Sequence, residues 1–131
     1  MHHDPIDLIV RRRRIAGMSA VFLPFMQGGG IDWDGFARHL QRTIDAGLVP
    51  AVNMDTGSVQ FLGDADRRRV LDIARSHTVD FVAGACVRDS QGDPFDSDAY
   101  RRMIFEIVER RFQEIRSPTL WVLPMPAPAL M

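Results

Sequence analysis

The sequence contains no lysine, and all 16 residues in its Lys-plus-Arg count are arginines. A guanidinium group stays protonated and does not form an imine with a ketone, whereas a primary amine with a lowered pKa does. The α-amino group at the amino terminus is therefore the only primary amine in these 131 residues. This absence excludes any mechanism in which a lysine of this chain forms a Schiff base.

Cysteine and long apolar runs are also scarce. The single cysteine, Cys86, excludes a disulfide within the chain and is typical of a reducing compartment. No apolar run approaches the ~20 residues of a membrane span, and no secretory signal follows the arginines at 11–14. We therefore expect a cytoplasmic protein.

The charges nearly cancel, with 16 basic and 17 acidic residues and a net charge of −1. This balance favours neither nucleic acid nor a membrane as a partner. A hydrophobic fraction of 46% and a charged fraction of 25% are those of an ordinary globular domain. The length indicates one domain.

The chain alternates between strand-like and helix-like patterns. Apolar runs predict buried strands at residues 18–25, 48–53 and 80–86. Helical periodicity follows each run, with Asp32 as a first N-cap, Gly47 as a C-cap glycine, a second helix at about 64–76, and Asp96 or Ser97 opening a third. Strand starts recur at roughly 30 residues, the length of a βαβ unit. The sequence therefore predicts an α/β fold with parallel strands, either an open doubly wound sheet or three to four units of a (β/α)8 (TIM) barrel.

The two ends differ from this pattern. Residues 1–14 form a basic amino-terminal segment, and residues 111–131 form an atypical Pro-rich tail. Pro124, Pro126 and Pro128 cannot continue a central strand or a helix, so the one candidate for a fourth strand is residues 119–123. We expect the tail to reflect a truncated or frame-shifted reading frame, with a natural proline-rich terminus as the alternative.

The clearest candidate site is the turn that follows the second predicted strand. Asn53 ends the strand, and the Asp55-Thr56-Gly57 turn leads toward the next helix. Ligands of parallel α/β folds bind at the carboxyl ends of strands, where small residues let backbone N–H groups approach a carboxylate or phosphate. We predict Asn53, Asp55, Thr56 and Gly57 as substrate-binding residues, with ordinary turn chemistry as the alternative.

This turn resembles the Gly-Thr-Thr-Gly-Glu turn of the dihydrodipicolinate synthase / N-acetylneuraminate lyase family. Thr56 and Gly57 match it, while Asp55 replaces the first threonine and Ser58 the glutamate. Further matches follow in order over residues 15–110: Leu23-Pro24-Phe25, Gly30-Ile31-Asp32, Ala46-Gly47-Leu48, Leu62, Asp66-Arg67 and Ala83-Gly84. The resemblance implies the N-terminal half of a (β/α)8 barrel.

The resemblance also implies an activity. It suggests an aldolase or lyase that makes or breaks a C–C bond through a Schiff base on a keto acid or aldehyde, without a cofactor and as a homo-oligomer. The family's tyrosine follows strand four and its lysine lies on strand six, regions without a counterpart here, and Tyr100 does not match. An aspartate beside an anionic substrate repels it unless protonated or bound to a cation. We therefore expect this chain to be an inactive fragment and leave its catalytic residues unassigned.

Two other functions stay open. Asp55 could bind Mg²⁺ in a metal-dependent lyase or hydrolase. Alternatively, the chain could be a non-catalytic α/β module that self-associates through open strand edges. We assign no metal site to His39 or His77 because no ligand spacing surrounds them. We interpret Cys86 as a buried small residue and residues 67–69, three arginines, as a solvated face.

Overall fold

The computed structural model describes residues 4–88, 90–112 and 122–124. Its strands form one parallel sheet in chain order: β1 (Met18–Ala20), β2 (Val49–Val52), β3 (Val82–Ala85) and β4 (Val122–Pro124). The connecting α-helices are α1 (Trp33–Asp45), α2 (Asp64–His77) and α3 (Ser97–Phe112). The predicted α/β fold with adjacent parallel strands is confirmed.

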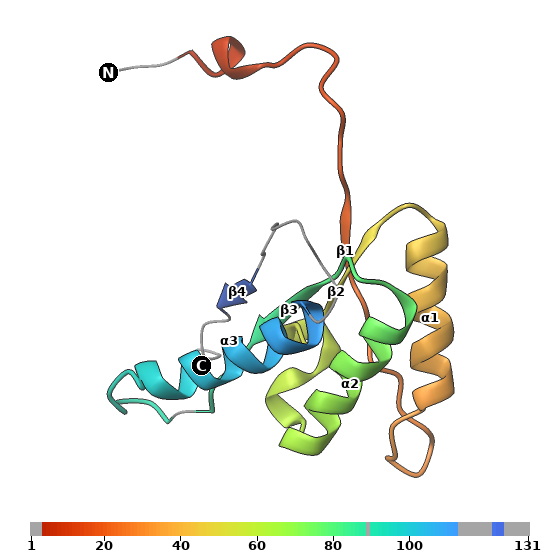
Figure 1. Cartoon of the computed structure of the whole chain (residues 1–131), viewed down its shortest axis with the longest axis vertical. Coiled ribbons are helices and arrows are strands. Elements are labelled where there is room, and N and C mark those ends of the chain that lie inside the picture. Colours follow the sequence, from red (N-terminus) through yellow and green to blue (C-terminus); the bar gives the residue numbers. More distant parts are fainter. Residues whose placement is uncertain (1–3, 89, 113–121, 125–131) are drawn as a thin grey trace.

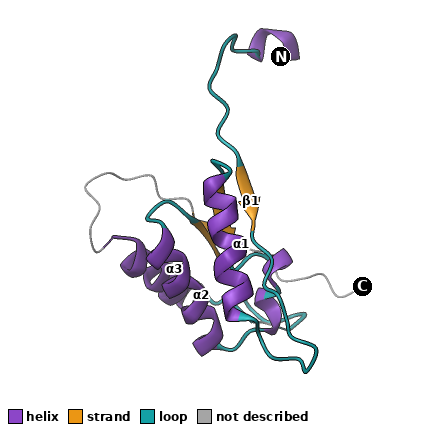
Figure 2. Ribbon diagram, turned by 90° about the vertical axis from the view of Figure 1, so that its right-hand side faces the viewer, coloured by secondary structure: helices purple, strands orange, loops and turns teal. Residues whose placement is uncertain are grey.

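The helices form a layer beside the sheet (Figures 1 and 2). Helix α2 packs against both α1 and α3, while α1 and α2 contact β2 and α3 contacts β3. At the α1–α2 interface the guanidinium of Arg69 lies over the ring of Trp33, with its central carbon 4.3 Å from the ring centroid. The layer therefore keeps the helices in chain order across the sheet.

The hydrophobic core fills the space between this helical layer and the sheet. Strand β3 contributes Ala83 and Ala85, two residues apart, because alternate side chains of a strand point to the same face. The helices contribute one apolar face each to this core, where Phe36, Leu40, Val70, Leu71, Ala74 and Ile107 are buried. Burying each of the large apolar side chains contributes about 1.5–3 kcal/mol.

Local signals set the helix boundaries. The Oδ1 atom of Asp32 accepts a hydrogen bond of 2.8 Å from the N–H of Gly35 and so caps α1. Helix α1 ends in a Schellman motif: Gly47 has φ +76°, its N–H donates to the carbonyl of Ile44, and the N–H of Leu48 donates to the carbonyl of Thr43. Glycine adopts this left-handed backbone without steric cost.

The sequence offers Asp96 or Ser97 as the residue that opens the third helix, and the structure decides between them. The Oδ1 atom of Asp96 accepts a 2.9 Å hydrogen bond from the N–H of Ala99, and the helix begins at Ser97. Asp96, and not Ser97, is therefore the N-cap.

The first strand is shorter than predicted. The prediction of a strand over residues 18–25 is correct at its amino end and wrong at its carboxyl end. Strand β1 ends at Ala20, although the N–H of Val21 still donates to the carbonyl of Ala51 at 2.9 Å. Pro24 has no N–H for a ladder, and Phe25 instead pairs antiparallel with Ile31 across a glycine-containing turn.

The fourth strand overlaps the predicted one. Strand β4 spans Val122–Pro124 and pairs in parallel with Ala83–Ala85, so Pro124 occupies the end of an edge strand, where proline is tolerated. The rest of the predicted Pro-rich tail, residues 113–121 and 125–131, lies outside the described residues.

The amino-terminal segment extends away from the body of the molecule (Figure 1). A short 3-10 turn, Pro5–Leu8, is capped by the Asp4 side chain, and the arginines at 11–14 are exposed. No α-helix within the described ranges has both the length and the apolar character needed to cross a bilayer.

Candidate functional site

The predicted Asp55-Thr56-Gly57 turn lies at the carboxyl end of β2. Asn53 directly follows the last residue of β2, the turn forms the 3-10 helix Asp55–Gly57, and a second 3-10 helix, Val59–Phe61, leads into α2. The position at the strand end is therefore as predicted from the sequence.

Asn53 and Ser58 are the two residues of this segment with a left-handed backbone, and Asn53 is also buried. Its side chain belongs to a residue only 3% exposed, and its φ of +52° lies in the left-handed region that non-glycine residues rarely adopt. The Nδ2 atom donates a 3.2 Å hydrogen bond to the carbonyl oxygen of Arg67 in the first turns of α2. Its Oδ1 atom is buried and has no hydrogen-bond partner among the described residues.

A second buried acceptor lies close by in the sequence. The Oε1 atom of Gln60 also lacks a hydrogen-bond partner within the described part of the chain. A buried acceptor without a donor costs about 1–3 kcal/mol, and such atoms in proteins are explained by strain, by a catalytic role or by a bound water or ion. Asn53 and Gln60 flank the predicted turn, so the segment has unused acceptors on both sides.

The turn itself divides its residues into an inner and an outer set. Gly57 is buried, and a Cβ placed on it would lie 3.4 Å from the carbonyl oxygen of Val21. Its N–H donates to the carbonyl of Met54, and the N–H of Ser58 donates to that of Asp55. The Gly57 N–H is therefore already used within the turn. Asp55 and Thr56 are exposed.

The prediction of a buried position for Cys86 is confirmed. Cys86 is buried directly after β3. His39 stacks on Phe22, and the Nδ1 atom of the exposed His77 lies 2.9 Å from Gln41 Oε1. No cluster of three or more His, Cys, Asp or Glu residues that could hold a metal ion occurs among the residues the structure describes.

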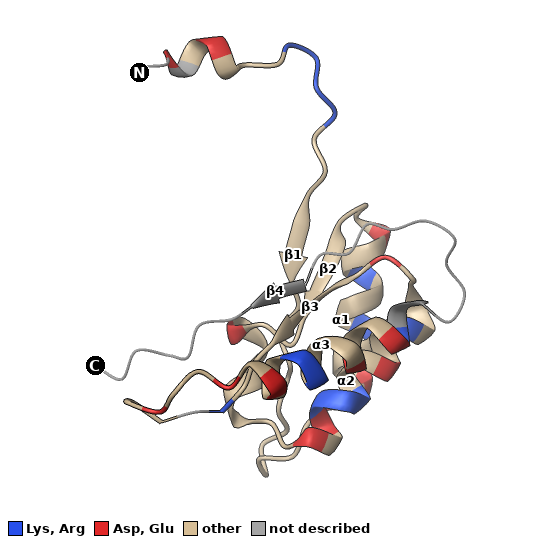
Figure 3. Cartoon of the chain, turned by 60° about the vertical axis from the view of Figure 1, so that its left-hand side comes forward, with Lys and Arg blue, Asp and Glu red and all other residues tan. Residues whose placement is uncertain are grey.

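Sequence reasoning missed a crevice between α2 and α3 beside the carboxyl end of β3. This arginine crevice has a volume of about 280 Å³ and is lined by Asp64, Arg67, Arg68, Cys86, Val87, Arg88, Ala99, Arg102, Met103 and Glu106. The basic stretches of α2 and α3 are visible in Figure 3. The expectation that residues 67–69 form a solvated face is wrong for Arg67, because its side chain is only 11% exposed.

Ion pairs hold the inner arginines of this crevice. Arg67 Nη1 lies 3.1 Å from Asp64 Oδ1, and Arg67 Nη2 lies 3.6 Å from Glu106 Oε2. Arg68 donates from Nε to Glu106 Oε1, and this hydrogen bond and the charge of Glu106 raise the pKa of Arg68. The run of arginines is visible in the sequence as a signal for a charged site. Their partner Glu106 lies on another helix, and no sequence pattern connects it to them.

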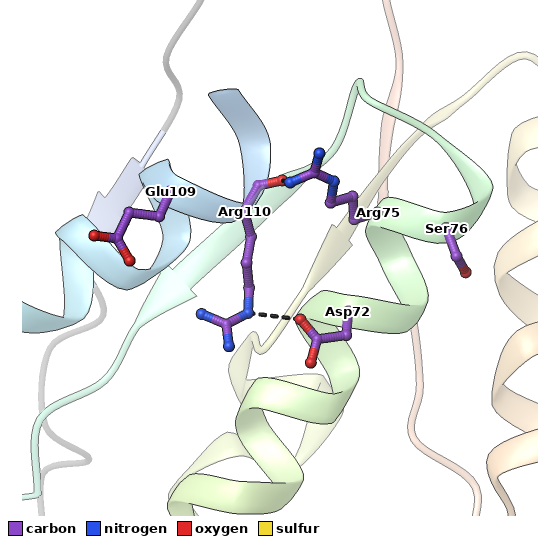
Figure 4. Close-up of a pocket in the computed structure, with 5 residues that line it drawn as sticks. All are labelled: Asp72, Arg75, Ser76, Glu109 and Arg110. Atoms are coloured by element: carbon purple, nitrogen blue, oxygen red, sulfur yellow. Dashed lines mark hydrogen bonds and ion pairs between the residues drawn. The ribbon is translucent and has the colours of Figure 1, made fainter. Parts of the chain in front are cut away.

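A second cavity lies between the other ends of the same two helices (Figure 4). It has a volume of about 590 Å³ and is lined by Asp72, Arg75, Ser76, Glu109 and Arg110. Arg110 Nε donates to Asp72 Oδ1 at 2.7 Å, and Arg75 Nη1 donates to the carbonyl oxygen of Arg110. These contacts join α2 to α3, so we interpret this cavity as a packing feature.

Comparison with known proteins adds no relative to this geometry. No protein-family model, curated protein or solved structure matches the chain. The geometry alone therefore offers two candidate sites: the turn after β2, with its left-handed and incompletely bonded Asn53, and the arginine crevice, whose Arg67 accepts a hydrogen bond from Asn53 at its backbone carbonyl.

Proposed function

We propose that the turn after β2 binds a small keto acid or aldehyde, and that the chain is the N-terminal half of a (β/α)8 aldolase or lyase similar to the dihydrodipicolinate synthase / N-acetylneuraminate lyase family. The observation that carries this proposal is the Asp55-Thr56-Gly57 turn at the carboxyl end of β2, next to the buried, left-handed Asn53 with its unused Oδ1. The unreversed order of four parallel strands supports a partial barrel.

The residues of the turn have distinct roles in this proposal. The exposed Thr56 hydroxyl donates to the ligand carboxylate, whereas the buried Asn53 Oδ1 accepts from a bound water. Asp55 opposes an anion at neutral pH, because two like charges at close distance repel each other. Binding by this chain is therefore weak, and a neutral aldehyde suits the turn better than a dianion.

The chain binds without turnover in this proposal. Its residues contain no lysine, so the Schiff base of the family reaction would require an amine from the complete enzyme. Treatment with pyruvate and borohydride, followed by peptide mapping, is expected to give no adduct on any internal residue. A stoichiometric internal adduct would contradict this expectation.

The binding step is tested by titrating pyruvate, and separately a small neutral aldehyde, into the protein while NMR records the chemical shifts of the turn. Thr56→Val keeps the shape but removes the hydroxyl, and we expect about tenfold weaker pyruvate binding from the lost charge-assisted hydrogen bond. Thr78→Val is the matched control, since Thr78 follows the far end of α2. Equal affinities for the two variants would overturn the proposed role of the turn.

A metal-dependent lyase or hydrolase is a second candidate, favoured by one observation. The unused Asn53 Oδ1 and the exposed Asp55 carboxylate stand two residues apart on one turn, and such oxygens suit Mg²⁺. Mg²⁺ binding that Asp55→Asn abolishes would favour this candidate. Mg²⁺ titration without any change in the spectrum of the turn would exclude it.

We also propose that the protein self-associates in the cytoplasm. The described sheet has β1 and β4 at its edges, and Met18 on β1 is 58% exposed. Open edges and exposed apolar residues favour pairing with a second copy. Sedimentation at several concentrations tests this, and a monomer over the whole range would contradict it.

A further inference from the structure

The arginine crevice carries an excess of positive charge that its own acidic residues do not cancel. Four arginines line it against two carboxylates, those of Asp64 and Glu106. Both carboxylates are already engaged by Arg67 and Arg68. The crevice therefore holds two further guanidinium groups, those of Arg88 and Arg102, without an acidic partner in the described part of the chain.

These two guanidinium groups have donors to spare. Arg88 uses Nη2 to donate to the carbonyl oxygen of Leu62, which fixes the arginine on the loop after β3. Arg102 on α3 makes no ion pair or hydrogen bond with the described residues. A guanidinium carries five N–H donors in a planar fork that matches the oxygens of phosphate, so both groups keep donors for an anion.

The walls of the crevice limit what it can hold. Ala99 and Met103 give it an apolar side, and its volume of about 280 Å³ admits a small molecule but no large cofactor. Arg67 is fixed by two carboxylates and Arg68 by one, so the inner wall is already organised before a ligand arrives.

We propose that the arginine crevice binds the phosphate group of a small phosphate monoester, with Arg88 and Arg102 donating to the phosphate oxygens and the Ala99–Met103 side contacting the organic part. This site is separate from the turn after β2, and it stands whether or not that turn binds a keto acid. The two inner residues, Arg67 and Arg68, form the inner wall of the crevice and add to the positive potential that attracts the phosphate.

The test uses the full chain with inorganic phosphate and glycerol 3-phosphate as probes, at constant ionic strength set by sodium chloride. Calorimetric titration is expected to give saturable binding at one site, with the monoester tighter than inorganic phosphate. Arg88→Gln and Arg102→Gln should each weaken binding about tenfold. The matched control is Arg101→Gln, which removes the same charge from the neighbouring exposed position of α3 outside the crevice and should change affinity less than twofold.

Three results would overturn the proposal. The first is the absence of saturable phosphate binding by the unmodified chain. The second is an equal loss for Arg101→Gln and Arg102→Gln, which would indicate general electrostatic attraction. The third is inorganic phosphate binding as tightly as the monoester, which would leave an adventitious ion only. Unchanged far-ultraviolet circular dichroism ensures that each variant is folded, and Thr56→Val should leave phosphate binding unchanged.

Discussion

The two cavities between α2 and α3 are built from the same pair of helices, but one has balanced charges and the other an excess of positive charge. In the cavity at the carboxyl ends of the helices, Arg75 and Arg110 face Asp72 and Glu109, and Arg110 is paired directly with Asp72. In the arginine crevice four arginines face two carboxylates. The added charge comes partly from Arg88, which belongs to the loop after β3 and to neither helix.

Glu106 stands between the two cavities and contacts the arginines of both. Its carboxylate lies within 3.6 Å of Arg67 Nη2 and 3.8 Å of Arg110 Nη1, and it also accepts from Arg68. Its side chain is only 16% exposed. The comparison teaches that helix packing places the Glu106 carboxylate between the two cavities. The loop after β3 adds Arg88 to one of them, and that cavity therefore has positive charge available for a ligand.

The largest effect is expected from loosening the packing beneath both cavities. Ile107→Ala removes a buried side chain of α3 from the core, and deletions of this kind cost about 2–5 kcal/mol of unfolding free energy. Urea denaturation followed by circular dichroism measures the loss. Val108→Ala, at a half-buried position, is the control and should cost less. Equal losses would mean that α3 does not pack as described.

A smaller effect is expected from Glu106→Gln, which keeps the shape but removes the shared charge. Arg67 keeps Asp64 as a partner, so we expect a loss of about 1–3 kcal/mol of unfolding free energy. The crevice becomes more positive, and phosphate should bind more tightly to this variant. The exposed Glu109→Gln serves as control, with a loss below about 0.5 kcal/mol. Weaker phosphate binding by Glu106→Gln would contradict the assigned charge balance.

The smallest effect is expected from Asp72→Asn in the balanced cavity. The Asp72–Arg110 pair is partly exposed, and such pairs contribute about 0–1 kcal/mol. Phosphate affinity of the crevice should stay unchanged, because the substitution lies at the other end of α2. Urea midpoints at low and high salt provide the measurement, and a loss as large as that of Glu106→Gln would remove the distinction between the two cavities.

Local signals predicted much of the fold. Asp32 and Gly47 bound α1 as expected because their effects act within one turn of the helix. The presence and order of the three α-helices followed from helical periodicity. The length of β1 was not predictable in the same way, since an apolar run continues through Pro24 whereas the ladder of hydrogen bonds does not.

The candidate site was predictable only in its position. The Asp55-Thr56-Gly57 turn stands at the strand end because strand and turn are adjacent in the sequence. The engagement of the Gly57 N–H, the left-handed backbone of Asn53 and the burial of Arg67 depend on atoms placed by the fold. Glu106 is 39 positions beyond Arg67 in the numbering, so no local pattern reveals their pairing.

The contact between Arg69 and Trp33 gives the protein an internal optical probe. Trp33 is one of two tryptophans in the sequence, and its ring is half-buried beneath a guanidinium group at the α1–α2 interface. In a Trp121→Phe background, its fluorescence would report the separation of these helices alone. Comparing this emission with circular dichroism during unfolding would reveal whether α1 detaches before the remaining layer or melts together with it.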